Sequence, residues 1–351
     1  MKASPSKPLM PLENDASSHG PAGRNSKNAS DKNTRPLAKR IPFRFDSIDL
    51  SRRYTLDSLS LTSNLMGTVR DAVIVAAGLG TRMLPTSAYI PKELLPLVDV
   101  PVLHHLIFEA REAGCSRIHI ITSPNKDFTS LEEDLNQMYP MYSKGKNHLN
   151  PLDGAEVFFH TQYEQKGLGH AIMMAKGKIQ GPFLVLLGDN ILTKNHSALT
   201  EFKPSTVSKE LVEMYNATQQ PCASVYDVGI DRVSNYGIVS MQDDSITSLV
   251  EKPTSADAPS TFALCGRYLY AADTFDLLEQ YSVEEYGELQ SIELLRHWMR
   301  QGELGAHLLD ASVAWYDSGL PLEWLKSQID HALRRPEYAQ QLRQWLDERM
   351  D

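Results

Sequence analysis

The feature that constrains the fold most is the order of short apolar runs and helical stretches between residues 72 and 190. Residues 72–77 (AVIVAA) and 182–190 (PFLVLLGDN) carry nearly continuous apolar runs, as strands buried on both faces do. Amphipathic stretches between them, at 102–114 and 169–179, predict helices. Strands and helices that alternate in this way predict an α/β fold, namely a three-layer sandwich with a mixed, mostly parallel sheet.

The second half predicts several more strands before the chain returns to helices. The expected strands span 223–228, 236–242, 246–252, 263–270, 306–310 and 313–319. Helices are expected over 273–281 and 292–301 and from Leu322 onward, with Pro336 at the start of a new helix. No linker composition appears after residue 70, so residues 70–351 are predicted to form one domain.

The first 69 residues have a different composition. Residues 1–40 hold eight Lys or Arg against three Asp or Glu, and they are rich in Ser, Pro, Asn and Gly. Such a segment buries too little apolar surface to offset the entropy lost on ordering. Residues 1–69 are therefore predicted to be a disordered or loosely packed N-terminal extension.

Composition excludes several classes of function. The formal net charge is −9, which argues against a protein that binds nucleic acid over a broad basic face. Cys115, Cys222 and Cys265 form no C-x-x-C pair, so neither a zinc site nor a disulfide framework is expected, and a cytoplasmic location fits. No apolar run reaches the roughly 18 residues that span a bilayer, so no membrane partner is expected.

Glycines follow the first strand, at the sheet edge where ligands of α/β folds bind. A dinucleotide-binding loop needs a third glycine where this chain has Met83, and Gly78 and Gly80 do not fit a Walker loop. The remaining interpretation is a Gly-x-Gly-Thr-Arg loop whose backbone amides approach phosphate oxygens. Arg82 and Lys92 then supply the positive charge that an acidic protein otherwise lacks.

These residues carry a family resemblance. VAAGLGTRMLP followed by IPKELLPLVDVPVL resembles the signature of sugar-phosphate nucleotidyltransferases, and QYEQKGLGHA (162–171) is similar to bacterial UTP–glucose-1-phosphate uridylyltransferases. The resemblance extends from about residue 70 to about 335. It implies a Rossmann-like nucleotidyltransferase fold and transfer of a uridylyl group from UTP to glucose-1-phosphate, which yields UDP-glucose and pyrophosphate. It also implies Mg²⁺ as cofactor, a nucleoside triphosphate and a sugar-1-phosphate as partners, and a homodimer or tetramer.

Catalysis of this kind needs positioning and charge neutralisation more than a base. A phosphate monoester is ionised near neutral pH because its second pKa is about 6, so it attacks the α-phosphorus without a general base. Arg82, Lys92 and Lys252, the last in Val-Glu-Lys-Pro, are the predicted catalytic cations. Asp189 ends an apolar strand where nothing structural requires a charge, and Asp317 lies in WYDSG. The resemblance makes both of them magnesium ligands.

The resemblance also implies the binding residues. Those expected to bind the nucleotide are Ala77, Gly78, Leu79, Gly80, Gln162 and Gly167. Those expected to bind the sugar are Gly237, Glu251, Gly266 and Glu288.

Two positions depart from the family pattern. Relatives usually carry a lysine where this chain has Ala88, and Asn-Lys where it has Leu320 and Pro321. Each missing contact to phosphate costs about 1.5–3 kcal/mol. Two alternatives therefore stay open: the same reaction with another nucleotide, such as dTTP, or another sugar-1-phosphate, and a non-catalytic paralogue that binds a nucleotide sugar and regulates a partner.

Overall fold

The structure is a computed structural model that describes residues 68–128, 131, 151–152, 154–197, 202–287 and 290–350, the last residue by its backbone only. All of them belong to one of the chain's two compact units, Leu56–Asp351. The N-terminal extension predicted over residues 1–69 lies outside the described residues, apart from 68 and 69. Glu288 also lies outside them.

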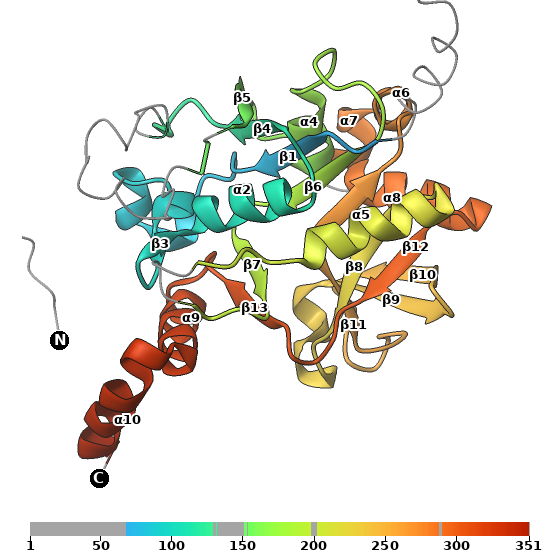
Figure 1. Ribbon diagram of the computed structural model, residues 1–351. Coiled ribbons are helices and arrows are strands. Elements are labelled where there is room, and N and C mark those ends of the chain that lie inside the picture. The colour runs from blue at the N-terminus through green and yellow to red at the C-terminus, as the bar shows by residue number, and fades with distance from the viewer. Residues whose placement is uncertain are drawn as a thin grey trace, which may run out of the picture. The chain divides into compact units, whose positions relative to one another are not determined.

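A nine-stranded sheet runs through the described region (Figure 1). From one edge to the other its strands are β5 (Glu156–Thr161), β4 (Arg117–Thr122), β1 (Asp71–Val75), β6 (Phe183–Leu187), β11 (Phe262–Tyr270), β8 (Cys222–Asp227), β12 (Gly305–Leu308), β10 (Ser245–Glu251) and β9 (Gly237–Gln242). The strands β5, β4, β1 and β6 pair in parallel. Antiparallel pairs dominate the second half, where only β12 and β8 are parallel. The predicted mixed sheet is confirmed.

The antiparallel half closes on itself. Strand β9 pairs with β11 as well as with β10, so β11, β8, β12, β10 and β9 form a closed circuit. Strand β11 takes part in both halves because its register shifts between Leu264 and Tyr268, around Gly266 at φ 78°. A bulge of this kind bends a strand, and here one end of β11 joins β6 while the other joins β9.

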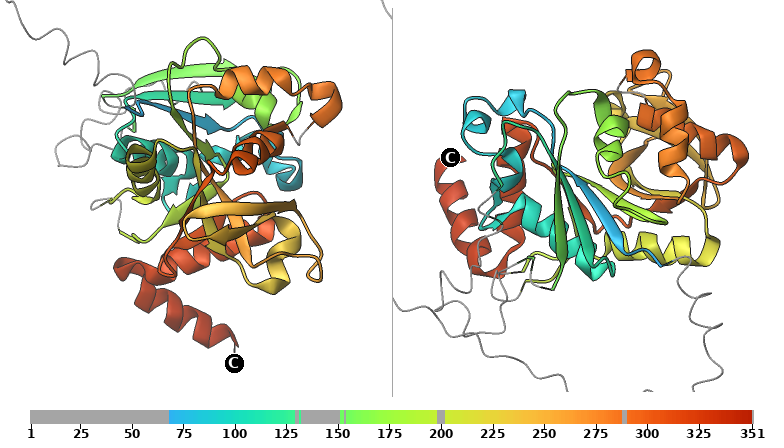
Figure 2. Two further views of the ribbon diagram at one scale, coloured as in Figure 1. Left: turned by 90° about the vertical axis from the view of Figure 1, so that its right-hand side faces the viewer. Right: turned by 90° about the horizontal axis from the view of Figure 1, so that it is seen from above.

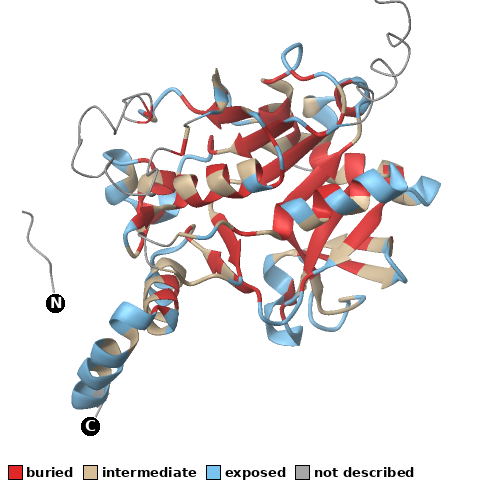
Figure 3. Ribbon diagram, in the orientation of Figure 1, coloured by how far each residue is buried: buried red, intermediate tan, exposed pale blue. Residues whose placement is uncertain are grey.

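Helices cover both faces of the sheet, which gives the three predicted layers (Figure 2). Side chains alternate along β1, so Ala72 and Ile74 pack on one face and Val73 on the other. The first face lies under α2 (Val102–Glu112) and α5 (Val207–Thr218). The other lies under α4 (Gly167–Met173), α6 (Thr274–Gln280) and α8 (Gln290–Gln301), beside the short helix α7 (Val283–Tyr286). Figure 3 shows the strands buried between these layers.

The last two helices are α9 (Pro321–Arg334) and α10 (Pro336–Met350), which begins at Pro336 as predicted. Helix α9 is fixed to a small hairpin of β2 (Pro96–Leu97) and β3 (Val100–Pro101). The Gln328 side chain donates to Pro96 O at 2.6 Å and accepts from the Val98 amide at 2.7 Å. None of the described helices is long and apolar enough to cross a membrane.

Candidate active site

The glycine loop leaves an open surface at the carboxyl end of β1. Gly80 adopts φ 66° and precedes the 3₁₀ turn η1 (Thr81–Met83), and Ser87 Oγ donates to its carbonyl at 2.7 Å. A Cβ added at Gly78 would meet no atom within 4 Å. Arg82 is exposed on η1. The loop therefore presents a backbone surface and a free guanidinium to whatever binds above it.

Below this loop, the 3₁₀ turn η3 (Lys92–Leu94) carries two buried charges. Lys92 Nζ lies 2.6 Å from Asp189 Oδ2. Burial alone would lower the pKa of the Lys92 ammonium, but Asp189 and Glu93 outweigh it, so the pKa is raised and Lys92 stays charged. Glu93 accepts from Lys126 Nζ at 2.8 and 2.7 Å. Lys126 also donates to Ala76 O at 2.6 Å, which ties η3 to the start of the glycine loop.

Two predicted metal ligands meet because a second, two-stranded sheet forms beside the first. Strand β7 (Asn190–Thr193) pairs with β13 (Ala314–Asp317) so that Asp317 lies opposite Asn190. The position of a Cβ added at Gly319 would lie 3.0 Å from Asp317 Oδ1 and 3.3 Å from Asp189 Oδ2. Two carboxylate oxygens therefore converge on one point, beside the Lys92 ammonium.

The pKa of Asp317 is raised, first by burial and also by the charge of Asp189. The amide of Gly319, which donates to Asp317 Oδ1 at 2.7 Å, opposes this rise. Carboxylates held this close repel one another, and a cation between them relieves that repulsion. Among the described residues no cluster of three or more His, Cys, Asp or Glu forms a metal site. The protein thus offers two carboxylates, and Mg²⁺ commonly takes its other ligands from water and phosphate.

Lys252 and Glu251 lie on the opposite side of the cleft, at the end of β10. Lys252 holds φ 46°, which is uncommon for a residue with a side chain, and its amide donates to Tyr236 O at 2.9 Å. Its ammonium lies 3.3 Å from Glu251 Oε1, and the Lys252 side chain is 61% exposed, so it stays available to a ligand. A Cβ at Gly237 would lie 3.0 Å from Glu251 Oε2, so a larger residue there would displace this carboxylate slightly.

The loop before α4 forms a further wall. Gln162 is buried, and its amide nitrogen donates to Gly167 O at 3.1 Å. Gln165, which sequence analysis did not single out, donates to Ala77 O at 3.1 Å. This hydrogen bond joins the 162–171 motif to the glycine loop. Two motifs far apart in the chain therefore form one continuous surface.

Most of these groups line one cleft of about 1270 Å³. The predicted residues that line it are Ala77, Gly78, Arg82, Lys92, Gln162, Gly167, Asp189, Gly237, Glu251, Lys252 and Asp317. Leu79, Gly80 and Gly266 are described but do not line it. A Cβ at Gly266 would meet Leu187 Cβ and Asn190 Nδ2 at 3.1 Å, so this glycine serves the packing of the β11 bulge.

Several lining residues were not among the predicted site residues. Arg232 and Tyr236 precede β9, and the Arg232 guanidinium donates to the Tyr236 hydroxyl at 2.8 Å. Leu320, Glu323 and Lys326 come from the start of α9. An amphipathic helix shows from sequence which face is apolar, but not which polar residue turns toward a cleft.

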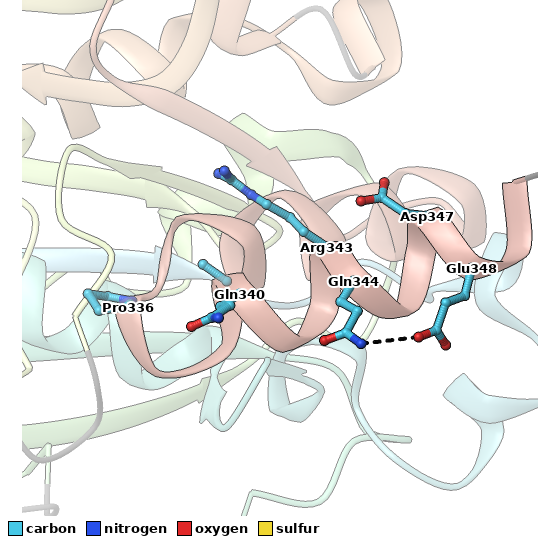
Figure 4. Close-up of a pocket in the computed structure, with 7 residues that line it drawn as sticks. Pro336, Gln340, Arg343, Gln344, Asp347 and Glu348 are labelled. Carbon is cyan, nitrogen blue, oxygen red and sulfur yellow. Dashed lines mark hydrogen bonds between the residues drawn. The ribbon is translucent and has the colours of Figure 1, made fainter.

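A second, shallow pocket of about 690 Å³ lies along α10 (Figure 4). Its lining residues are Pro336, Ala339, Gln340, Arg343, Gln344, Asp347 and Glu348. Gln344 hydrogen-bonds Glu348 within it at 3.2 Å. None of the residues predicted to carry chemistry lies there, so the large cleft is the candidate active site.

Comparison with known proteins shows the family of the chain. A family profile described as "Nucleotidyl transferase" matches residues 71–330. The chain belongs to the nucleotidyl transferase family. The match begins at β1 and ends within α9, so it contains both the glycine loop and the two aspartates.

Individual members of the family are similar over most of the chain. A UTP–glucose-1-phosphate uridylyltransferase of Staphylococcus epidermidis is 33% identical over 296 residues, which cover 80% of this chain and 98% of that protein. One from Streptococcus pneumoniae is 32% identical over 293 residues, 79% and 95% of the two chains.

Solved structures show the same fold. A UDP-glucose pyrophosphorylase complexed with UDP-glucose matches with a TM-score of 0.64 at 29% identity, over 75% of this chain and 98% of that one. A UTP-bound UGPase from Acinetobacter baumannii matches with a TM-score of 0.66 at 27% identity, over 80% and 99%.

Proposed function

We propose that this nucleotidyl transferase moves a uridylyl group from UTP to glucose-1-phosphate and releases UDP-glucose and pyrophosphate. The observation that carries the proposal is the meeting of Lys92, Asp189 and Asp317 in a cleft that also holds the glycine loop and Lys252. The relatives named UTP–glucose-1-phosphate uridylyltransferase match this chain over nearly the whole of their own length.

In the proposed reaction an oxygen of the sugar phosphate attacks the α-phosphorus of UTP. A new P–O bond forms, the bond between the α-phosphorus and the oxygen that bridges to the β-phosphate breaks, and pyrophosphate leaves with that electron pair. The nucleophile is already anionic, so the residues of the cleft need to position it and to balance charge. Arg82 and Lys92 would neutralise the triphosphate, and Lys252 would hold the sugar phosphate.

Asp189 and Asp317 would hold Mg²⁺ in this proposal. One oxygen of each lies within 3.3 Å of the Cβ position of Gly319, beside a buried ammonium. Oxygen donors with a net negative charge are the ligands that Mg²⁺ prefers. When bound, such an ion supplies charge stabilisation to the phosphate oxygens. Lys92 and the glycine-loop amides would balance the remaining negative charge of the phosphate oxygens.

The nucleotide and the sugar would contact different walls of the cleft. Ala77, Gly78, Gln162 and Gly167 would contact the nucleotide at the loop wall. Leu79 and Gly80, in the same loop, stay predicted nucleotide contacts although they do not line the cleft. Gly237 and Glu251 would contact the sugar at the wall of β9 and β10. Gly266 supports this wall by packing, and Glu288 remains a prediction outside the described residues.

The state of the cysteines bears on the location of the protein in the cell. Cys115, Cys222 and Cys265 are all buried free thiols, which supports the predicted cytoplasmic location. A homodimer or tetramer stays a prediction.

One assay separates the proposed reaction from its alternatives. The purified protein is mixed with Mg²⁺ and a panel of nucleoside triphosphates and sugar-1-phosphates, and pyrophosphate release is measured. We expect release with UTP and glucose-1-phosphate. Faster release with dTTP or another sugar-1-phosphate would favour the related reaction. No release from any pair would leave the non-catalytic nucleotide-sugar-binding paralogue, an alternative motivated by Leu320 in the cleft and by Ala88.

Asp189→Asn is the sharpest test of the site. It keeps the shape of the side chain but removes a charge that pairs with Lys92 and faces Asp317, so turnover should fall at least a hundredfold, or by about 3 kcal/mol in transition-state stabilisation. Asp243→Asn, in the exposed β9–β10 turn, is the matched control. Full activity of Asp189→Asn with a normal melting temperature would remove Asp189 from the site.

A further inference from the structure

A lysine outside every sequence motif lines the candidate active site. Lys326 lies on α9, a helix that begins directly after Gly319 and Leu320. Leu320, Glu323 and Lys326 follow one another at intervals of three residues, and all three line the cleft. One side of the first turns of α9 therefore forms part of its wall.

The charge of Lys326 is available to a ligand. Its side chain is 61% exposed, and its described ionic partner is Glu323, whose Oε1 lies 2.8 Å from the Lys326 Nζ. Exposed pairs of this kind contribute little to stability, because water screens both charges. A phosphate, with more charge and several acceptor oxygens, competes well for such an ammonium.

The surroundings of Lys326 decide which phosphate it can reach. Glu323 lies close enough to Asp317 for its charge to act on that carboxyl group. The Gly319 Cβ position, just before α9, lies 3.0 Å from Asp317 Oδ1 and 3.9 Å from Lys92 Nζ. Lys326 thus belongs to the wall that carries Lys92. Lys252, by contrast, has its described partner Glu251 at the sugar wall.

We propose that Lys326 contacts the terminal phosphates of the nucleoside triphosphate and, after transfer, the departing pyrophosphate. This inference rests on the proposed function. It accounts for two departures in this chain, since Ala88 and the Leu320-Pro321 pair stand where related sequences carry lysines. A cation about one and a half turns further along α9 restores a positive charge to the cleft without occupying either position.

The other cation that the sequence did not predict fits this task less well. Arg232 lines the cleft from η6 (Ile230–Asn235), next to β9, and its guanidinium already donates to the Tyr236 hydroxyl. Tyr236 is the residue whose carbonyl holds the Lys252 amide. Arg232 therefore lies at the sugar wall rather than beside Lys92.

Steady-state kinetics in both directions test this assignment. Lys326→Ala should raise the KM for UTP in the forward reaction, and the KM for pyrophosphate in the reverse reaction, by about tenfold each. The KM for glucose-1-phosphate should stay within about twofold, because the lost contact is to the other substrate. Lys326→Arg should recover most of the loss, since it restores a cation of similar reach.

Lys209→Ala is the matched control. Lys209 is also exposed and paired with a glutamate, Glu112, at 3.3 Å, but it does not line the cleft. It should leave all three KM values unchanged. A tenfold change in the KM for glucose-1-phosphate, or unchanged values for both UTP and pyrophosphate in Lys326→Ala, would overturn the assignment.

Two measurements distinguish failure of this inference from failure of the proposed function. If the wild-type chain forms no UDP-glucose, the proposed function fails, and titration calorimetry with Mg²⁺ and inorganic pyrophosphate then measures the same contact directly. Tenfold weaker binding of pyrophosphate to Lys326→Ala than to Lys209→Ala supports the inference. Equal binding overturns it.

Discussion

A buried ion pair holds the strand that follows Asp189, and its removal should be costly. Arg267 on β11 and Glu109 on α2 are 0% and 1% exposed. Two bonds join them, from Nε to Oε1 at 2.8 Å and from Nη2 to Oε2 at 2.9 Å. Arg267 also donates to Asn190 O at 2.8 Å, and Ser208 Oγ donates to Glu109 Oε1 at 2.6 Å. Four elements, α2, α5, β7 and β11, thus meet at one pair.

The expected magnitude follows from this burial. Arg267→Met leaves a carboxylate with the Ser208 hydroxyl as its remaining described donor, and Glu109→Leu leaves a buried guanidinium without its counter-charge. Each single change should lower the free energy of unfolding by about 3–5 kcal/mol. For a domain of this size that corresponds to a loss of roughly 10 °C in melting temperature. The double variant Arg267→Met/Glu109→Leu removes both charges and should recover most of the loss.

The double variant should still work poorly as an enzyme. It lacks the donor to Asn190 O, so the peptide that follows Asp189 loses a constraint on its position. We therefore expect a stable protein whose turnover is reduced about tenfold.

Urea unfolding of the wild type, both single variants and the double variant gives the coupling energy directly. The single variants and the double variant are compared at one pH and one salt concentration, with pyrophosphate release measured on the same samples. A loss below 1 kcal/mol in Arg267→Met, or losses that simply add in the double variant, would refute the idea that this pair acts as a buried unit.

Two other predictions follow from burial and from open space. Burial lowers the pKa of His105 to about 3 and of His331 to about 4, so both are neutral when folded, whereas the unfolded chain begins to bind protons near pH 6.5. Stability should therefore fall as pH drops below about 6.5, by about 2 kcal/mol per histidine at pH 5. His105→Phe should remove about 2 kcal/mol of the loss that urea unfolding measures between pH 7 and pH 5, and an equal loss in both proteins would contradict the assignment. A Cβ at Gly78 meets nothing within 4 Å, so Gly78→Ala should keep the wild-type melting temperature but raise the KM for UTP. A Cβ at Gly188 would lie 2.5 Å from Val75 O, so Gly188→Ala should lower the melting temperature strongly, and similar melting temperatures for the two variants would contradict this reasoning.

Much of the fold and of the site could be predicted from local patterns. The apolar runs of β1 and β6 are buried on both faces, and this leaves a distinctive sequence of consecutive hydrophobic residues. Gly78, Arg82 and Lys92 follow the first of these runs closely, so their spacing alone indicated a phosphate-binding loop. Asp189 was recognisable because a charge directly after a buried strand has few structural uses. These signals are short in range and need no knowledge of distant contacts.

Other elements left no such signal. Strand β7 has four residues that follow a buried strand closely, and no separate element was predicted there. Helix α5 was not predicted. Lys126, which ties Glu93 to the glycine loop, follows a strand in an unremarkable turn. In each case the chemistry depends on which distant segment packs against the residue.

By itself the sequence determined the layered fold and predicted a phosphate-binding loop and the charged residues beside it, because periodicity and strand ends are local properties of a chain. Only the tertiary structure decided that Asp317 meets Asp189, because the pairing of β13 with β7 joins segments far apart in the sequence. It also decided that Lys326 faces the cleft, since the direction of a helix face depends on where the whole helix is anchored. The α9 contacts with the β2–β3 hairpin set that anchor.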